Sequence, residues 1–316
     1  MSSSPSRLKI ASAFAAIYII WGSTYLGIRF AVETIPPFLM AGGRFLVSGV
    51  LLYAWVQSRT PARPTLNQWK SAAIVGGLLL VGGNGVVAWA EQWVPSGITA
   101  LIIASTPISF VLIDAFQRKT PPTMDVVSGL VLGTVGIFLL IDPTRLIAGD
   151  EIYLPGAFAI LLADVAWAYG SLYSRKADLP SNPLLATAME MLAGGVLLTL
   201  TGLLLGETGR MDISAISSQS LLAFLYLIAF GSLIAFTSYV WLLRVASPAM
   251  VSTYAYVNPV IAVFLGWLIG NEVMSGRIFL AASIIVGAVA IITTFNARRT
   301  ARSMKNLKVQ NTSQKQ

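Results

Sequence analysis

Three charged side chains stand in the middle of long apolar stretches, where a charge without a partner is costly. Arg44 follows "PPFLMAGG", Asp164 lies in "LLADVAW", and Glu190 lies in "TAMEMLAGG". Asp164 is a candidate for a carboxylate that takes up and releases a proton; the alternative is that it only bonds to a neighbouring hydroxyl. For Arg44 and Glu190, a functional charge pair and separate satisfaction by carbonyls, waters or loops both stay open.

The stretch "TYAYVNPV" at 253–260 places polar groups beside a helix breaker inside an apolar run. Pro259 has no amide hydrogen and crowds the carbonyl of Ala255, so the helix is predicted to bend or loosen there. Non-helical backbone at that depth is tolerated where protein or cavity water can satisfy it. The proline therefore predicts a position that faces the interior of the protein.

At 100° per residue, Tyr254 and Asn258 share one face of this helix, and Ser252 and Tyr256 share nearly the opposite face. The Tyr254/Asn258 face is predicted to line a cavity, and the Ser252/Tyr256 face to bond to a neighbouring helix. In the alternative interpretation, Asn258 only caps the carbonyls that Pro259 frees, and the tyrosines pack.

The chain contains no Cys and no His. Thiol nucleophiles, Ser-His triads and zinc sites built from His or Cys are therefore impossible within it. No loop has the spacing GxxxxGK[ST] that cradles nucleotide phosphates. The sequence thus predicts no enzyme, no metal and no cofactor.

Composition indicates the elements that hold these residues. Hydrophobic residues make up 56% of the chain and charged residues 11%, with a mean hydropathy of +0.75. Soluble domains contain about 25% charged residues, so this is a membrane protein. About 20 apolar residues cross a bilayer core. We predict an all-α polytopic fold with ten transmembrane helices, at 8–30, 36–56, 69–93, 96–116, 123–141, 155–174, 183–205, 221–243, 249–269 and 277–295.

The two halves of the chain repeat one another. Matches at an offset of 146 residues include Trp21 with Trp167, Pro37 with Pro183, Leu46 with Leu192 and Gly49 with Gly195, and matches at 152 include Trp89 with Trp241 and Pro107 with Pro259. Five helices per copy is an odd number, so the second copy must enter the membrane from the opposite side. The predicted units are two inverted five-helix repeats at 8–141 and 155–295, followed by a basic tail at 296–316.

Tryptophans within the spans come in repeat-related pairs, with polar neighbours beside the first pair. If they line a cavity, their flat faces and single indole donors suit a partly apolar, planar or zwitterionic solute. Packing in a duplicated scaffold is the alternative. The residues concerned are Trp21, Ser23, Thr24, Trp89, Trp167, Tyr169 and Trp241.

Lys and Arg fix the expected orientation. With a cytoplasmic amino terminus, sixteen of the 21 would lie on the inside, four would lie in outside loops, and Arg44 would lie within a span. This asymmetry places both termini in the cytoplasm. The basic tail is then a topology anchor beside anionic lipid rather than a nucleic-acid site.

Several of these stretches resemble the drug/metabolite transporter superfamily, in its EamA group. They are "YIIWGSTYLGIR" at 18–29, "PPFLMAGGRFL" at 36–46, "GNGVVAWAE" at 83–91 and "SPAMVSTYAYVNPVIAVFLG" at 247–266. The resemblance implies a multi-pass inner-membrane carrier with a cavity lined by helices 1 to 4 and 6 to 9. It also implies efflux of amino acids, nucleobases, drugs or other small metabolites.

The sequence therefore predicts a secondary active transporter, an exporter of a small organic metabolite. A passive channel or facilitator is the alternative, since Asn258-Pro259 is similar to the Asn-Pro of water and glycerol channels. Expected partners are the substrate, membrane lipid and protons if a carboxylate couples them; monomer and homodimer stay open. The expected substrate-binding residues are Trp21, Ser23, Thr24, Arg44, Asn84, Trp89, Thr106, Trp167, Tyr169, Trp241, Tyr254 and Asn258, with Asp164 and Glu190 for coupling and Pro107 and Pro259 as helix breaks.

The first prediction concerns topology. Because the chain has no native cysteine, single cysteines report sidedness directly. Cysteines near Arg145 and Arg210 should react with a membrane-impermeant reagent added outside intact cells, and cysteines near Arg63 and Lys119 only after permeabilisation. External labelling near Arg63 would contradict the orientation.

Overall fold

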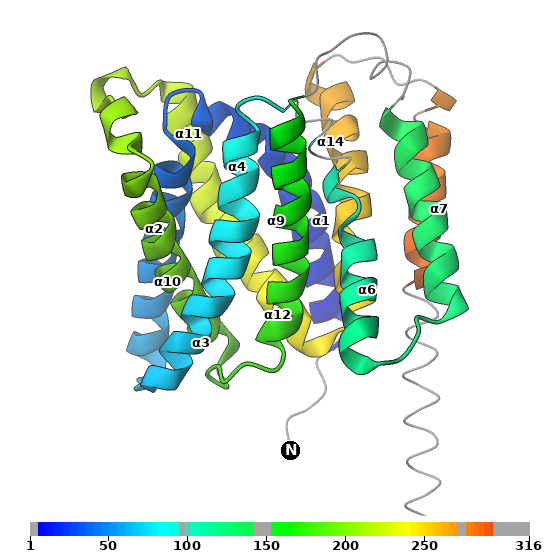
Figure 1. Cartoon of the computed structure of the whole chain (residues 1–316), viewed down its shortest axis with the longest axis horizontal. Helices are drawn as coiled ribbons and strands as arrows, with labels where there is room; N and C mark the ends of the chain where they lie inside the picture. The colour runs from blue at the N-terminus through cyan, green and yellow to red at the C-terminus, as the bar shows by residue number, and fades with distance from the viewer. Residues whose placement is uncertain are drawn as a thin grey trace, which may run out of the picture.

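The computed structural model describes residues 6–94, 99, 102–141, 153–270, 276–277 and 279–292, and within them all regular structure is helical. The helices lie side by side and run up and down in Figure 1. In the first half they are α1 (Arg7–Val32), α2 (Pro37–Arg59), α3 (Leu66–Gly76), η1 (Gly77–Gly85), α4 (Val86–Ala90), α6 (Thr106–Arg118) and α7 (Met124–Ile141).

The second half follows the same order. Its elements are α9 (Leu154–Ser174), α10 (Pro183–Leu204), η2 (Glu207–Arg210), η3 (Ile213–Ala215), α11 (Ser218–Tyr226), η4 (Leu227–Phe236), α12 (Thr237–Val245), α13 (Pro248–Val251), α14 (Tyr254–Gly270) and a last helical segment at 279–292. Of these, α3, η1 and α4 form one continuous rod, as do α11, η4 and α12.

Six helical rods are long and apolar enough to cross a membrane, which confirms a polytopic membrane protein. They are Arg7–Val32, Pro37–Arg59, Leu66–Ala90, Leu154–Ser174, Pro183–Leu204 and Ser218–Val245. Two shorter apolar helices, Met124–Leu139 and Phe279–Ile292, accompany them among the described residues. The count of ten spans stays a prediction.

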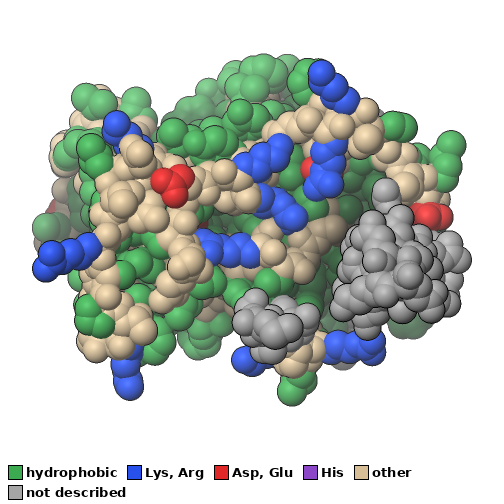
Figure 2. All heavy atoms as spheres, turned by 90° about the horizontal axis from the view of Figure 1, so that it is seen from below, with side chains coloured by type: hydrophobic (Ala, Val, Ile, Leu, Met, Phe, Trp, Pro, Cys, Tyr) green, Lys and Arg blue, Asp and Glu red, His purple; other side chains and the backbone are tan. Residues whose placement is uncertain are grey.

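The basic connections gather on one face of the bundle. The start of α1 and the connections α2–α3, α6–α7, α9–α10 and α12–α13 all lie at the lower end in Figure 1. Figure 2 looks onto that end and shows Lys and Arg side chains spread across it. One face therefore carries the charges that the sequence assigns to the cytoplasm; which compartment it meets stays a prediction.

The most extensive packing between two described helices joins α2 to α10 and passes through glycines. A Cβ added at Gly49 would lie 3.0 Å from the backbone nitrogen of Leu192, and one added at Gly195 would lie 2.9 Å from that of Leu46. Adding 146 to Gly49 gives Gly195, and subtracting 146 from Leu192 gives Leu46, so the repeat offset turns one pair into the other with the two helices exchanged. A two-fold relation between the two copies produces such reciprocity.

Both copies also contain a π-helical stretch at the corresponding place, η1 in the first and η4 in the second. In each, a glycine lets a helix of the other copy come close. A Cβ on Gly83 of η1 would lie 2.7 Å from the Trp167 ring of α9, and one on Gly231 of η4 would lie 3.3 Å from Thr24 of α1. The sequence did not predict these π-helices, which often occur at functional sites.

The predicted helix at 249–269 is interrupted rather than only bent. It divides into α13 and α14 at Ser252 and Thr253, before Pro259. Both hydroxyls bond back to backbone carbonyls, Ser252 to Ala249 at 3.2 Å and Thr253 to Met250 at 2.6 Å. Such bonds compete with the regular helical ladder, which explains the earlier position of the break.

A buried carboxylate from the second half caps α2. Glu207 is fully buried and accepts the backbone N–H groups of Phe38 at 3.3 Å and Leu39 at 2.9 Å. A negative charge at a helix N-terminus satisfies donors that have no partner within the helix. Sequence reasoning missed this contact because the two segments lie 168 and 169 residues apart.

The second prediction tests the reciprocal glycine contact. Gly49→Ala and Gly195→Ala each place a methyl group against backbone that cannot rotate away, so each should cost about 1–3 kcal/mol and lower the Tm by several degrees. Thermal unfolding of the detergent-purified protein measures this. The two losses should be similar, whereas Gly209→Ala, where nothing lies within 4 Å, should change little. A negligible effect at both helix positions would show that α2 and α10 do not pack this closely.

Candidate functional site

A cavity lies among helices of both halves, with an empty volume of about 660 Å³ that includes its opening. α1, α2, η1, α4, α6, α9, η4 and α14 contribute to its wall. The lining residues are Trp21, Thr24, Tyr25, Ile28, Arg44, Gly83, Asn84, Val87, Ile103, Thr106, Ala163, Asp164, Trp167, Phe236, Tyr254 and Asn258.

Aromatic rings crowd one end of the cavity. Trp21 and Trp167, which are repeat-related, meet edge to face with ring centroids 5.7 Å apart. Tyr254 packs on Trp21 at 5.0 Å, and Tyr239 contacts both tryptophans, at 5.0 and 5.2 Å. We call Trp21, Trp167, Tyr239 and Tyr254 the aromatic floor.

The bundle is sealed below this floor. Ile17 lies one turn before Trp21 on α1, and Phe110 lies one turn after Thr106 on α6. Both are fully buried, and both belong to the hydrophobic cluster that contains the floor. In the other direction the α1 wall continues to Ile28, toward the upper end of the bundle in Figure 1.

Arg44 brings a positive charge to the wall. Its side chain is 4% exposed; Nε donates to Ser232 Oγ at 2.8 Å, and the guanidinium lies over the Phe45 ring at 4.4 Å. Among the described residues no carboxylate forms an ion pair with it, so the Arg44–Glu190 pair, one of the two alternatives that the sequence leaves open, is not formed in this conformation.

Asp164 is surrounded by hydroxyl groups of α6 and the turn before it. Ser109 donates to Oδ2 at 2.5 Å, Ser105 donates to Oδ2 at 3.4 Å, and Thr106 donates to Oδ1. Asp164 thus has the neighbouring hydroxyls that one of the two sequence interpretations expected. It also lies in the cavity wall. Whether the carboxylate couples protons stays a prediction.

Two of these hydroxyls have a second acceptor. Thr106 Oγ1 also lies 2.5 Å from the carbonyl of Ile103, and Ser105 Oγ lies 2.6 Å from that of Ile102. Ile103 is four residues before Pro107, which has no N–H to bond its carbonyl. The carbonyl of Ile103, which Pro107 leaves without a backbone donor, is therefore an alternative acceptor for the Thr106 hydroxyl.

The helix that contains Asn258-Pro259 directs Tyr254 and Asn258 to one side and Tyr256 to another. Tyr254 and Asn258 both reach the cavity wall, and the Asn258 amide nitrogen, oriented toward acceptors, donates to the carbonyls of Tyr254 at 2.9 Å and Tyr18 at 3.2 Å. Tyr256 points away and donates to the Leu130 carbonyl of α7 at 3.2 Å. Ser252 bonds only within its own turn among the described residues.

Eight predicted substrate-binding residues and Asp164 lie in the cavity wall, and four predicted substrate-binding residues do not. The eight are Trp21, Thr24, Arg44, Asn84, Thr106, Trp167, Tyr254 and Asn258. Ser23 instead contacts the Tyr226 hydroxyl, Trp89 packs on Trp93, Trp241 packs against the main hydrophobic cluster, and Tyr169 is 44% exposed on the outer surface.

Glu190 is buried away from the cavity, between α10 and its neighbours. Neither carboxyl oxygen has a hydrogen-bond partner among the described residues, and Arg244 is the basic group that acts on it electrostatically. Gly76 of α3 packs closely against this turn of α10, since a Cβ added to it would lie 2.6 Å from the Glu190 carbonyl oxygen.

Sequence reasoning missed Tyr25 and Ile28, among other wall residues. Both follow Trp21 at helical spacing, at i+4 and i+7, and so lie on the same side of α1 as Trp21. A sequence analysis that placed Trp21 in the cavity wall could therefore have placed these two residues there as well. Phe236 and Gly83 gave no such signal, because they lie in the π-helical stretches.

Comparison with known proteins identifies the family. The model of the EamA-like transporter family matches residues 8–142 and again 154–294. The chain belongs to the EamA-like transporter family. This confirms the resemblance to the EamA group of the drug/metabolite transporters, in its YedA-type branch.

Relatives of this family cover nearly the whole chain. The inner membrane transporter YedA of Escherichia coli (strain K12) is 42% identical over 90% of this chain and 91% of its own. The transporter YoaV of Bacillus subtilis (strain 168) is 25% identical over 92% of this chain and 99% of its own. A solved crystal structure shares the fold, with a TM-score of 0.75 at 23% identity over 93% of this chain and 99% of its own.

The third prediction tests access to the cavity without a known substrate. Thr24→Cys places a thiol in the wall and should react with a small water-soluble methanethiosulfonate. Ser48→Cys, on the face of α2 that is bonded to Ile228, is fully buried and should not react. Mass spectrometry of the labelled protein measures both; equal labelling of the two, or none at position 24, would contradict the cavity.

Proposed function

We propose that this chain is a secondary active transporter of the inner membrane that exports a small organic metabolite by alternating access. Its ten helices form two inverted five-helix repeats, with both termini in the cytoplasm. The observation that carries the proposal is the central cavity, to which both halves contribute paired aromatic rings and one buried charge each. Transporters of this build bind substrate at the interface of their repeats.

The position of the seals supports alternating access. The wall above the aromatic floor leads to the upper end of the bundle, whereas Ile17 and Phe110 close the bundle below it. With the basic face in the cytoplasm, this conformation is closed to the inside. A channel would need a path through the floor, so the sealed layer favours a carrier over the facilitator.

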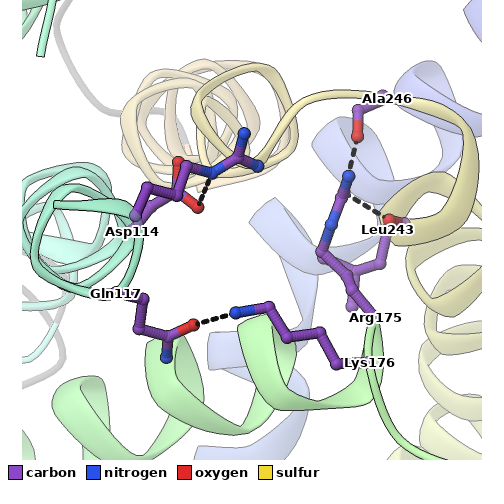
Figure 3. Close-up of polar contacts among 7 residues, drawn as sticks. Asp114, Gln117, Arg175, Lys176, Leu243 and Ala246 are labelled. Atoms are coloured by element: carbon purple, nitrogen blue, oxygen red, sulfur yellow. Dashed lines mark hydrogen bonds and ion pairs between the residues drawn. The ribbon is translucent and has the colours of Figure 1, made fainter. Parts of the chain in front are cut away.

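Polar contacts at the lower end are candidates for the inner gate. Figure 3 shows Arg175, at the end of α9, reaching across to the C-terminal end of α12, where Nη1 donates to the carbonyls of Leu243 at 2.5 Å and Ala246 at 2.8 Å. Beside it, Lys176 donates to Gln117 of α6 at 3.0 Å. Opening to the cytoplasm would break these contacts between α6, α9 and α12, and water can replace the two exposed ones, to Ala246 and to Gln117.

The hydroxyl groups around Asp164 suit a carboxylate that changes its protonation state. When the carboxylate is ionised, the Ser105 and Thr106 hydroxyls donate to it. When it is protonated, its O–H donates to a hydroxyl, which then donates to its second acceptor on the helix backbone. The other titratable groups that act on Asp164 electrostatically are Tyr25, Tyr239 and Tyr254.

The fourth prediction tests carrier function and coupling together. Proteoliposomes loaded with a metabolite mixture should show saturable efflux that an imposed pH gradient accelerates. Asp164→Asn should abolish that acceleration and leave solute exchange measurable, because the amide cannot release a proton. Glu190→Gln should do the same only if Glu190 is the coupling group.

The matched control is Asp114→Asn. Asp114 pairs with Arg118 near the lower end of α6 and lies outside the cavity wall, so the pH response should persist. Non-saturable flux would favour the channel. An unchanged pH response in both Asp164→Asn and Glu190→Gln would leave the two acids with structural roles.

A further inference from the structure

The cavity wall holds one cation and one anion among its described residues, and the protein treats them differently. Arg44 and Asp164 are both almost completely buried, at 4% and 5% exposure. Asp164 is surrounded by hydrogen-bond donors, whereas Arg44 has hardly any acceptors. This difference, rather than the presence of two opposite charges, defines what the cavity can recognise.

Arg44 is left with unused donors. A guanidinium has five N–H groups in a fixed fork, and among the described residues only Nε has a protein acceptor, the Ser232 hydroxyl. Phe45 covers one face of the fork without accepting a hydrogen bond from it. The terminal N–H groups thus remain for a ligand in the cavity, and a planar carboxylate matches them in geometry and charge.

Asp164 has the opposite arrangement. Three hydroxyls lie within hydrogen-bond distance of its two oxygens and can donate to them, so the protein itself compensates its charge. A ligand ammonium would have to displace a hydroxyl donor or share a crowded oxygen to bond there. Recognition of a ligand cation is therefore not built into this side of the wall.

The aromatic floor supplies the third element. Trp21 and Trp167 are each 8% exposed and meet at 75°, so they offer an apolar corner next to the charged wall. Trp21 Nε1 donates to the Gly231 carbonyl at 3.3 Å and is thus already engaged. A flat apolar group fits such a corner by stacking and edge contacts.

We propose that the cavity binds an organic monocarboxylate with a flat apolar body and no ammonium group. Its carboxylate accepts hydrogen bonds from the terminal N–H groups of Arg44, and its ring lies against the aromatic floor. Asp164 remains bonded to its hydroxyls and takes no part in charge recognition. As the description of a transported substrate, this inference rests on the proposed function; as a statement about binding, it can be tested alone.

Binding is measured by intrinsic tryptophan fluorescence and thermal shift on the full-length protein in detergent, with four probes. They are phenylacetate, phenylacetamide, phenylalanine and phenethylamine, which vary the carboxylate and the ammonium on one ring. Phenylacetate should bind, and phenylacetamide and phenethylamine should bind at least about tenfold more weakly, because a charge-assisted contact is lost. Phenylalanine should bind more weakly than phenylacetate.

Variants assign the effect to Arg44. Arg44→Gln should weaken phenylacetate binding by about tenfold or more and leave phenylacetamide binding unchanged. Arg44→Lys should retain part of the phenylacetate affinity, because the lysine ammonium keeps the positive charge but lacks the planar pair of N–H donors of the guanidinium. Arg29→Gln, an equal change of charge at an exposed position, should leave binding unchanged. Thermal unfolding without ligand shows whether each variant is folded.

Three results would overturn the inference: no saturable binding of phenylacetate, tighter binding of phenylalanine than of phenylacetate, or unchanged phenylacetate binding in folded Arg44→Gln and Arg44→Lys. Gradient-dependent flux of other solutes would then leave the proposed function intact. Conversely, Arg44-dependent phenylacetate binding without flux of any solute would refute transport and preserve the inference about the site.

Discussion

The contact between α2 and α10 is the constraint from which the arrangement of the other helices follows. In lipid, helices do not associate through the hydrophobic effect, so close packing of small residues provides the attraction. Gly49 and Gly195 let the two backbones approach until each meets the main chain of the other helix. The contact joins equivalent helices of the two copies. This one interface therefore sets the position of the first copy relative to the second.

The same helix then serves the cavity with another face. On α2, Gly42 and Gly49 point to α10, while Arg44 and Ser48 meet η4. The helical period separates these faces: positions seven apart lie nearly in line, and position 44 is turned by 200° from position 42. The tight packing that builds the scaffold therefore also holds the guanidinium against the cavity.

Irregular backbone gathers around the cavity, where side chains can satisfy it. The break before α14 is bonded by the hydroxyls of Ser252 and Thr253, and the carbonyl that Pro107 leaves free meets the hydroxyl of Thr106. In the membrane such backbone groups must be satisfied by protein or cavity water. Helices that are already interrupted need fewer hydrogen bonds to be broken when they move, which suits the alternating access that we propose.

Hydropathy and the internal repeat predicted the class of fold, because both depend on local composition and on chain order. They also identified the residues with a repeat partner on the inner face, Trp21 and Trp167. The neighbours Ser23 and Tyr169 lie outside the cavity wall for a reason visible in the sequence. Each lies two positions after its tryptophan, a rotation of 200°, and so faces away from the cavity.

Other features required the three-dimensional arrangement. The Glu207 cap of α2 joins segments far apart in the chain, and π-helices have no sequence signature strong enough to predict them. Trp89 and Trp241 were repeat partners in the sequence, yet both lie outside the cavity wall. Two residues at equivalent positions of the two copies are therefore expected to have similar surroundings. Whether those surroundings include the cavity depends on which side of its helix each residue lies.

The charged residues show how a duplicated scaffold becomes directional. Arg44 and Glu190 occupy equivalent positions on α2 and α10, but Arg44 reaches the cavity and Glu190 is enclosed between helices without a hydrogen-bond partner among the described residues. Asp164, on α9, corresponds to Tyr18 on α1, which bonds to the Thr253 hydroxyl instead. Backbone symmetry thus gives two similar halves around one cavity, while the side chains give it one unsatisfied cation and one fully bonded anion. A solute in such a cavity experiences a field of fixed direction, so the side chains can orient it even though the two halves of the chain resemble each other.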